Sequence, residues 1–404
     1  MNIKLVLALL IFVFACKEVQ KNTKLEKGNY RAELKINDTL SLPFILEVVS
    51  EKKLIIYNAE EVIEVTEINY KNDSVYIKTP VFEGFIVAKI EDAVLKGSFV
   101  KPDLNRIMEF KAEVNNTRFI INENTTKYDV SGNWAAVFSP NSDEDKYVAK
   151  GIFKQHGNKV TGTFRTTTGD YRYLEGVLNG NQLQLSTFDG AHAFLFTAEV
   201  NDSVMRGMFY SGNHWKEPFI AKRNPDYKLP DADTLTFLND GYDNVEFTFP
   251  DETGKKVSLS DNRFKDKVVL IQIMGTWCPN CLDESKFYAN YYSMHANKGL
   301  EIIGLAFEYA KTKDKAFKNI NRLKESIGIN YPVLLAQYGS ASKVKAQETL
   351  PMLNHVLSYP TTIYIDKKGA VRKIHTGFNG PATGHKYKEF KQEFDSFVNR
   401  LLAE

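Results

Sequence analysis

The sequence predicts a multidomain chain: an amino-terminal all-β part made of two related antiparallel modules, each a barrel or a sandwich, followed by an α/β domain. Three observations support this prediction. Before about residue 224, short runs alternate apolar and polar residues between Gly, Asn and Asp turns. Similar segments occur twice within this first part. From about residue 245, long apolar runs alternate with helical patterns, which is typical of a layered α/β sheet.

The chain begins with a predicted export signal. Leu5 to Ala15 form an apolar stretch that is too short to span a bilayer as a helix but suits the core of a signal peptide. The stretch ends in Val13-Phe14-Ala15-Cys16, which resembles a bacterial lipoprotein cleavage site, although Phe14 is bulkier than the usual residue. This resemblance implies that Cys16 becomes the lipidated first residue of the mature protein. An ordinary signal peptide that happens to contain a cysteine is the alternative.

The all-β part contains an internal repeat. GNYRAEL at 28–34 is echoed by GNWAAVF at 132–138, and LKGSFV at 95–100 is echoed by MRGMFY at 205–210. Each module has room for about eight strands, enough to close a small up-and-down barrel or to form a sandwich. The aromatic residues could line a pocket, but we expect them to form core and cross-strand contacts. These residues are Tyr30, Trp134, Tyr171, Tyr173, Phe194 and Trp215.

The α/β part has recognisable buried strands and helices. Two runs are apolar enough to be strands buried on both faces: KVVLIQIMG at 267–275 and GLEIIGLAFE at 299–308. Between them, Phe287, Tyr291 and Met294 recur at helical spacing, which predicts a helix over 279–297. We expect the remaining elements to be a helix at 312–327, strands at 361–366 and 370–376, and a final helix at 385–402.

The segment GTWCPNC at 275–281 holds two of the three cysteines of the chain. Cys278 directly follows a buried strand and starts a helix, with Pro279 at the first helical position, where its missing N–H costs nothing. Helix amides and the helix dipole favour a negative charge at Cys278, which lowers the pKa of a thiol. Cys281 lies one turn later, close enough to form a small disulfide ring. This arrangement suits a dithiol that exchanges with other disulfides.

Other roles for the cysteine pair have weaker support. A zinc site needs four ligands, and the chain has no second Cys-x-x-Cys, so His355 and His375 would have to converge. A structural disulfide with two intervening residues would add little stability. A peroxidase of the peroxiredoxin type usually carries threonine three residues before its reactive cysteine, and that position is Gly275 here.

Several segments carry a resemblance to a known family: FTFPDETGKKVSLSD (247–261), VVLIQIMGTWCPNC (268–281), GLEIIGLAFE (299–308), YPTTIYIDKKG (359–369) and GFNGPATG (377–384). Through them, residues 245–404 resemble the membrane-anchored thioredoxin-like disulfide reductases, a group that includes proteins of cytochrome c maturation. The resemblance implies a thioredoxin fold and a cis peptide bond before Pro360, facing the cysteines. An extended substrate could then pair with the backbone there. We expect Trp277 and Tyr359 to contact the substrate.

The resemblance also implies the chemistry, thiol–disulfide exchange in the reducing direction. Cys278 would attack a substrate disulfide, and Cys281 would resolve the mixed disulfide. Thioredoxin carries a buried aspartate six residues before its first cysteine, which helps to move protons, but this chain has Gln272 there. Glu284, three residues after Cys281, has the spacing of a glutamate in the anchored reductases and could replace that aspartate. An ordinary surface glutamate is the alternative.

The expected partners follow from these features. A formal charge of +2 over 404 residues gives no electrostatic case for nucleic acid. We expect protein disulfide or dithiol substrates, a membrane electron donor or acceptor, no cofactor and no metal, in a periplasm-facing lipoprotein of the cell envelope. The competing hypothesis is a binding lipoprotein whose disulfide is passive. The expected domains are a lipoprotein signal peptide at 1–15, a tether at 16–27, β modules at 28–115 and 129–223, a linker at 224–244 and a thioredoxin-like domain at 245–404.

Overall fold

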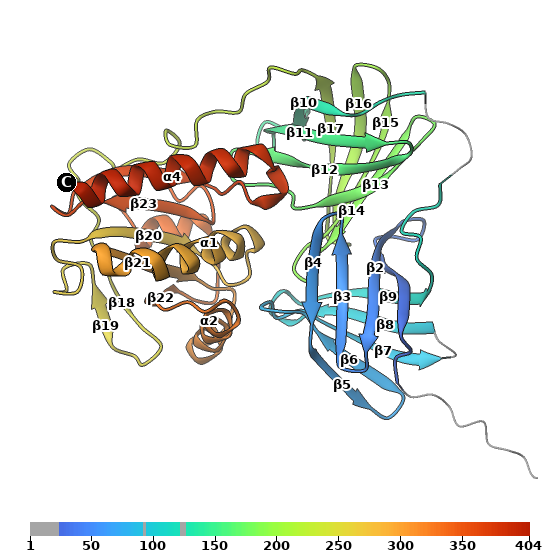
Figure 1. Cartoon of the computed structure of the whole chain (residues 1–404), viewed down its shortest axis with the longest axis horizontal. Coiled ribbons are helices and arrows are strands. Elements are labelled where there is room, and N and C mark those ends of the chain that lie inside the picture. The colour runs from blue at the N-terminus through green and yellow to red at the C-terminus, as the bar shows by residue number, and fades with distance from the viewer. Residues whose placement is uncertain (1–23, 92–93, 122–126) are drawn as a thin grey trace, which may run out of the picture.

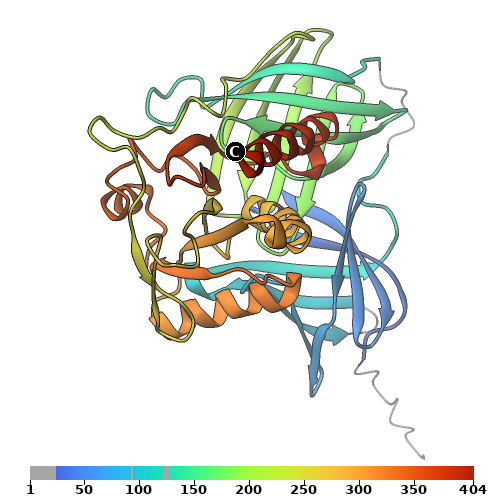
Figure 2. The ribbon, with the colours of Figure 1, turned by 60° about the vertical axis from the view of Figure 1, so that its left-hand side comes forward.

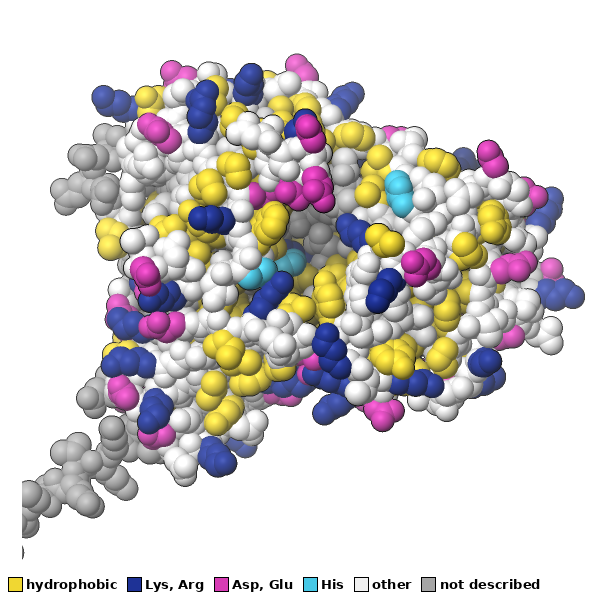
Figure 3. All heavy atoms as spheres, turned by 180° about the vertical axis from the view of Figure 1, so that it is seen from behind, with side chains coloured by type: hydrophobic (Ala, Val, Ile, Leu, Met, Phe, Trp, Pro, Cys, Tyr) yellow, Lys and Arg dark blue, Asp and Glu magenta, His cyan; other side chains and the backbone are white. Residues whose placement is uncertain are grey.

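The computed structural model describes residues 24–91, 94–121 and 127–404. Figure 1 shows three parts in contact: a first β module, a second β module above it, and an α/β domain beside both. A view turned by 60° shows the same arrangement (Figure 2). From behind, the surface is hollowed where the parts meet (Figure 3). The predicted signal peptide, Cys16 and most of the tether lie outside the described residues.

The first module is one antiparallel sheet of nine strands, one more than expected. Its order is β4-β3-β2-β1-β9-β8-β7-β6-β5, so the last strand returns to pair with the first. β4 and β5 are separated only by Thr66, yet they lie at opposite edges of the sheet, which therefore curls without closing. The strands are β1 (Gly28–Lys35), β2 (Ser41–Ser50), β3 (Lys53–Asn58), β4 (Glu61–Val65), β5 (Glu67–Lys71), β6 (Ser74–Lys78), β7 (Phe85–Glu91), β8 (Val94–Lys101) and β9 (Arg106–Val114).

The second module is a closed up-and-down barrel of eight strands. The sequence predicted either such a barrel or a sandwich. Each strand pairs with the next, and β17 pairs with β10 to close the barrel. The strands are β10 (Gly132–Phe138), β11 (Tyr147–His156), β12 (Lys159–Thr166), β13 (Leu174–Asn179), β14 (Gln182–Phe188), β15 (Ala193–Val200), β16 (Val204–Ser211) and β17 (Trp215–Arg223).

The two modules share features that the internal repeat suggested, although the first is an open sheet of nine strands and the second a closed barrel of eight. In both, the first and last strands pair, through β1 with β9 and through β10 with β17. The echoed segments occupy equivalent places in the register: Gly97 faces Phe110 in the first module, and Gly207 faces Phe219 in the second. The antiparallel all-β prediction for this half of the chain is therefore confirmed.

Aromatic side chains fill the closed barrel. Phe138 lies within 6.4 Å, between ring centroids, of Phe164, Phe196 and Phe219. Of the six aromatic residues singled out in the sequence, Tyr30, Trp134 and Phe194 are buried, Tyr171 packs on Phe138, and Tyr173 is partly buried. Trp215 is the exception, because 46% of it is exposed. The barrel interior is thus a packed core, as expected for most of these residues.

The two modules also share a core. Phe188, at the end of β14 in the barrel, is fully buried among first-module residues, with its ring 4.5 Å from Phe44 and 5.0 Å from Phe99. Arg118, in the connection between the modules, donates to Ser186 Oγ, to Ser186 O and to the carbonyl of Tyr57. Residues of the second module therefore complete the core of the first.

The third part is a five-stranded sheet with the order β22-β21-β20-β23-β24. The three strands β20, β21 and β22 are parallel, and β23 and β24 run antiparallel to their neighbours. α1 and α4 pack together through Phe287, Tyr291 and Phe394. The elements are β20 (Val268–Met274), α1 (Pro279–His295), β21 (Leu300–Phe307), α2 (Lys313–Ile327), β22 (Val333–Gln337), α3 (Lys343–Thr349), β23 (Thr361–Ile365), β24 (Val371–Thr376) and α4 (His385–Ala403).

The sequence prediction missed parts of this domain and erred at one residue. β22, α3 and the hairpin of β18 (Thr248–Pro250) with β19 (Lys256–Ser258) were not expected. Met294 was assigned to the apolar face of α1, but 51% of it is exposed, and His295 is buried instead. The predicted linker packs on the domain, where Leu238 pairs with Leu353. Among the described residues, none of the helices combines the length and apolar character needed to cross a membrane.

Candidate active site

The cysteine pair lies where β20 ends and α1 begins. Cys278 caps the helix, Pro279 is its first residue, and Cys278 and Cys281 form a disulfide with their Cα atoms 5.2 Å apart. Cys278 is 6% exposed and Cys281 is fully buried. The sequence placed both cysteines in this setting, with Cys281 the more shielded of the two.

The backbone around Cys278 favours negative charge on its sulfur. The Cys281 amide donates to Cys278 Sγ at 3.1 Å, so one of the unpaired amides of the first turn points at this atom. A helix start adds the positive end of the helix dipole. Both effects stabilise a thiolate over a thiol, which lowers the pKa of a cysteine once the disulfide is reduced.

Three residues predicted from the family resemblance lie beside the pair. The Tyr359–Pro360 peptide bond is cis, and Cys278 Sγ lies 3.4 Å from the Tyr359 carbonyl oxygen. Trp277 donates from its ring nitrogen to the Phe307 carbonyl at 2.8 Å and packs against the rings of Tyr309 and Tyr359. Trp277, Tyr359 and Pro360 therefore form a rigid rim around the exposed edge of Cys278.

Glu284 is fully buried under the cysteine pair, so it is not a surface residue. Its carboxylate accepts hydrogen bonds from Gln272 Nε2 at 2.8 Å, Thr362 Oγ1 at 3.0 Å and Tyr288 OH at 3.2 Å. The same Gln272 amide group lies 3.4 Å from the Cys281 carbonyl oxygen. Burial raises the pKa of Glu284 to about 7, against the opposing effect of these hydrogen bonds. The carboxyl can therefore change its proton near neutral pH, next to the helix turn that carries Cys281.

A second buried carboxyl, Glu308, was not identified from the sequence. It follows β21 and accepts from the Thr276 amide at 2.8 Å and the Thr276 hydroxyl at 2.6 Å. Burial raises its pKa to about 7. A glutamate directly after a strand buried on both faces is the signal that could have revealed it, because such a position is usually apolar.

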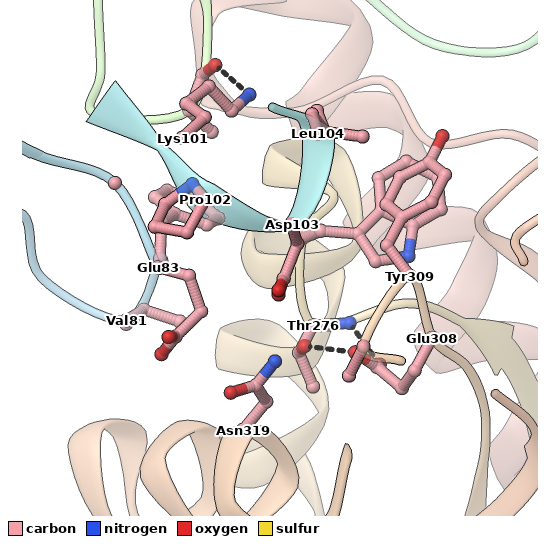
Figure 4. Close-up of a pocket in the computed structure, with 15 residues that line it drawn as sticks. Val81, Glu83, Lys101, Pro102, Asp103, Leu104, Thr276, Glu308, Tyr309 and Asn319 are labelled. Atoms are coloured by element: carbon pink, nitrogen blue, oxygen red, sulfur yellow. Dashed lines mark hydrogen bonds between the residues drawn. The ribbon is translucent and has the colours of Figure 1, made fainter. Parts of the chain in front are cut away.

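Glu308 borders a pocket between the α/β domain and the β modules. Figure 4 shows side chains from three elements around it: Glu83 from the first-module loop, Asp103 from the short helix η1 (Pro102–Leu104), and Asn319 from α2. The pocket has a volume of about 60 Å³ and is lined mainly by apolar atoms. Trp277 also lines it, so free space adjoins the segment that carries the cysteines.

The barrel touches the other side of the redox segment. Its loop between β12 and β13, residues 167–173, is called the barrel loop here. Asn280, which lies between the two cysteines, donates to the Asp170 carbonyl at 3.2 Å. Arg172 is buried and forms ion pairs with Asp283 of α1, with Glu61 of the first module and, at 3.5 Å, with Asp189 of the barrel. This one guanidinium joins all three parts of the chain.

Comparisons with known proteins agree with this geometry. The model of the AhpC/TSA family matches residues 241–374. The thiol-disulfide oxidoreductase ResA of Bacillus thuringiensis subsp. konkukian is 30% identical over 150 residues, which are 37% of this chain and 75% of that protein. ResA of Bacillus subtilis is 29% identical over 150 residues, covering 37% of this chain and 74% of its own.

A solved structure gives a weaker likeness. The putative thiol:disulfide interchange protein DsbE from Chlorobium tepidum aligns over 40% of this chain and 99% of its own, with 18% identity and a TM-score of 0.30, which carries no argument by itself. The ResA relatives are similar enough, over enough of their length, to decide the family. This chain belongs to the thioredoxin-like thiol-disulfide oxidoreductases of the AhpC/TSA family and is a relative of the ResA proteins.

Proposed function

We propose that the protein is an exported, lipid-anchored reductase of protein disulfides in which Cys278 attacks and Cys281 resolves. The observation that carries the assignment is the hydrogen bond from the Cys281 amide to Cys278 Sγ at the start of α1. It favours a thiolate on the more exposed cysteine, and a thiolate is the attacking species in exchange. The names of the ResA relatives support this class of reaction.

The proposed reaction moves two electrons from the protein dithiol to the substrate. The Cys278 thiolate attacks one sulfur of a substrate disulfide, forms a mixed disulfide and releases the other sulfur as a thiolate that takes up a proton. Cys281 then loses its proton and attacks Cys278 Sγ, which releases the second substrate thiol and leaves the Cys278–Cys281 disulfide. Glu284, with a pKa of about 7, is suited to accept the proton of Cys281. Trp277, Tyr359 and Pro360 would hold the substrate chain.

The remaining parts of the proposal concern location and regeneration. The amino-terminal apolar stretch and Cys16 support export and lipid attachment, with the body of the protein facing the periplasm. A membrane dithiol donor would then restore the reduced cysteine pair. The sequence supports the first statement, and the resemblance to the anchored reductases supports the second.

The test uses the full chain and two single variants, Cys278→Ser and Cys281→Ser. Reduced Cys281→Ser should form a stable mixed disulfide with a small aromatic disulfide, detected by mass, while Cys278→Ser should form none. Trapping by Cys278→Ser alone, or faster alkylation of Cys281 than of Cys278 in the reduced wild type, would contradict the assignment. Equilibration with glutathione measures the reduction potential of the cysteine pair and so tests the direction of the reaction. A potential below about −200 mV supports a reductase, and a potential of about −120 mV supports an oxidant of dithiols.

A further inference from the structure

We propose that the barrel loop occupies the groove in which a protein substrate would dock on the redox site. In this closed arrangement small disulfides reach Cys278, and protein disulfides are kept out until the loop is released. The inference rests on the proposed function, because it concerns the substrates of the same cysteine pair. It assigns the second β module a role: control of access to the α/β domain.

The barrel loop contacts the segment that carries the cysteines. The Asp170 carbonyl accepts a hydrogen bond from Asn280, between Cys278 and Cys281. Gly169 approaches so closely that a Cβ atom there would lie 2.1 Å from Asn280 Nδ2. Its φ of +151° also favours glycine. The loop is therefore fitted to the dipeptide between the cysteines.

The barrel loop also contacts the residues on both sides of the rim at Tyr359–Pro360. Ser358 donates from its hydroxyl to the Thr168 carbonyl at 2.9 Å. Gly377, whose amide donates to the Pro360 carbonyl, lies against Thr168: a Cβ atom on Gly377 would be 2.6 Å from the Thr168 carbonyl carbon. The backbone of Thr168 thus lies where an extended substrate chain would have to run beside Tyr359.

The segment after Gly377 completes the contact. The Gly380 amide donates to Asp170 Oδ2 at 2.7 Å, and Arg165, on β12, donates to Asn379 Oδ1 at 2.8 Å. Three segments near the disulfide are therefore in contact with the barrel: 278–281, 358–360 and 377–380. Cys278 is left only 6% exposed.

Size decides which disulfides can react in this arrangement. Exchange requires a substrate sulfur to approach Cys278 Sγ, and a protein disulfide brings the two chains that flank it. Those chains need the space that the barrel loop fills, whereas a small disulfide needs room only for its own few atoms.

The interface is of a kind that can separate. The contacts of the barrel loop and Arg165 described above are hydrogen bonds and the ion pairs of Arg172, and polar interfaces between domains of one chain commonly permit relative motion. Two clefts, of about 500 and 650 Å³, border Arg165 between the barrel and the α/β domain. Release of the barrel loop would therefore uncover the redox site without unfolding either part.

The experiment compares the full-length wild type with Arg165→Ala and with the double variant Arg165→Ala/Asp170→Asn. Arg165→Ala removes the hydrogen bond to Asn379. Asp170→Asn puts either an amide nitrogen or a weaker acceptor opposite the Gly380 amide. The matched control is Arg206→Ala/Asp202→Asn, which alters exposed barrel residues. Two rates are measured for each protein: reduction of a small aromatic disulfide, and reduction of insulin.

The rate of insulin reduction should rise at least about tenfold in the double variant. Each lost hydrogen bond to a charged group should shift the equilibrium between the closed and the released loop by about tenfold toward the released loop. The rate with the small disulfide should stay within about twofold, and the control should match the wild type. An unchanged ratio of the two rates in the double variant would overturn the proposal. A wild type that reduces neither the small disulfide nor insulin would refute the proposed function instead.

Alkylation of Cys278 gives a second readout that needs no turnover and no variant. In the reduced wild type, a maleimide carrying a long polymer should react at least about tenfold more slowly than iodoacetamide, after correction for their rates with a free thiol. The double variant should lose most of that difference. Equal corrected rates for the two reagents in the wild type would show that the loop does not cover the site, whether or not the protein reduces any disulfide.

Discussion

Replacing Glu284 by glutamine should change how the stability of the α/β domain depends on pH. Glu284 is fully buried, and its pKa is raised to about 7 in the folded protein, from 4.5 for an unperturbed glutamate. The folded protein therefore binds this proton more tightly than the unfolded chain does. Stability gained from that difference is fully present at low pH and is lost as the pH rises through the window between these two pKa values.

The size of the effect follows from the two pKa values. Each pH unit in the window is worth about 1.4 kcal/mol, so between about pH 5 and pH 8 the wild type should lose about 2.5 kcal/mol through this carboxyl. The side-chain amide of the Glu284→Gln variant cannot ionise, so the difference in unfolding free energy between variant and wild type should shift by that amount in favour of the variant. The amide also alters hydrogen bonds, which changes the unfolding free energy of the variant by an amount that does not depend on pH. Comparing the variant with the wild type at several pH values removes this constant.

The assay is urea unfolding of the oxidised proteins at several pH values, with hydrogen exchange of peptides from β20 and α1. Exchange reports this domain separately, which matters because a multidomain chain need not unfold in one step. Glu308→Gln is the matched control, since Glu308 is an equally buried carboxyl whose pKa is also about 7. The double variant should lose both contributions, about 5 kcal/mol in all. A difference between Glu284→Gln and wild type that stays constant from pH 5 to pH 8 would refute the reasoning.

Two further predictions concern the amino-terminal half. Cys16→Ser should abolish lipid attachment, and a variant that is still lipid-modified and recovered with membranes would contradict the lipoprotein assignment. Phe188→Ala should destabilise the β modules by about 3–5 kcal/mol, because the ring fills the shared core beside Phe44 and Phe99. Urea unfolding measures the loss, and hydrogen exchange should rise in β2 and β8 as well as in β14. Faster exchange confined to the barrel would show that the first module does not depend on this ring.

The sequence predicted those parts of the fold whose signals are local. The run 268–274 is apolar except for Gln272, and such a run is typical of a strand buried on both faces, so its place in the sheet could be inferred. β22 was missed because its five residues offer too short a run to distinguish strand from helix. Met294 was misassigned because helical spacing alone does not tell which residues at the edge of an apolar face meet solvent.

The same distinction holds for the site. The positions of Cys278, Cys281 and Pro360 follow from motifs in which the neighbouring residues fix the geometry. The contacts of the barrel loop do not, because Thr168 and Ser358 are far apart in the chain and each is an ordinary turn residue. Arg172 shows the limit most clearly: its three carboxylate partners come from three parts of the fold, and no local pattern marks them.

The core that the two β modules share has a consequence for the order in which the chain folds. Synthesis delivers the amino-terminal residues first, and domains generally fold as they emerge. The first module, however, completes its core only with Phe188, Ala193 and Leu195, which follow it by some seventy residues or more. Until those residues arrive, its apolar interior stays open to solvent and to other chains. The newly made chain therefore passes through a stage that needs protection from aggregation, and that stage ends when β14 and β15 pack on the first module.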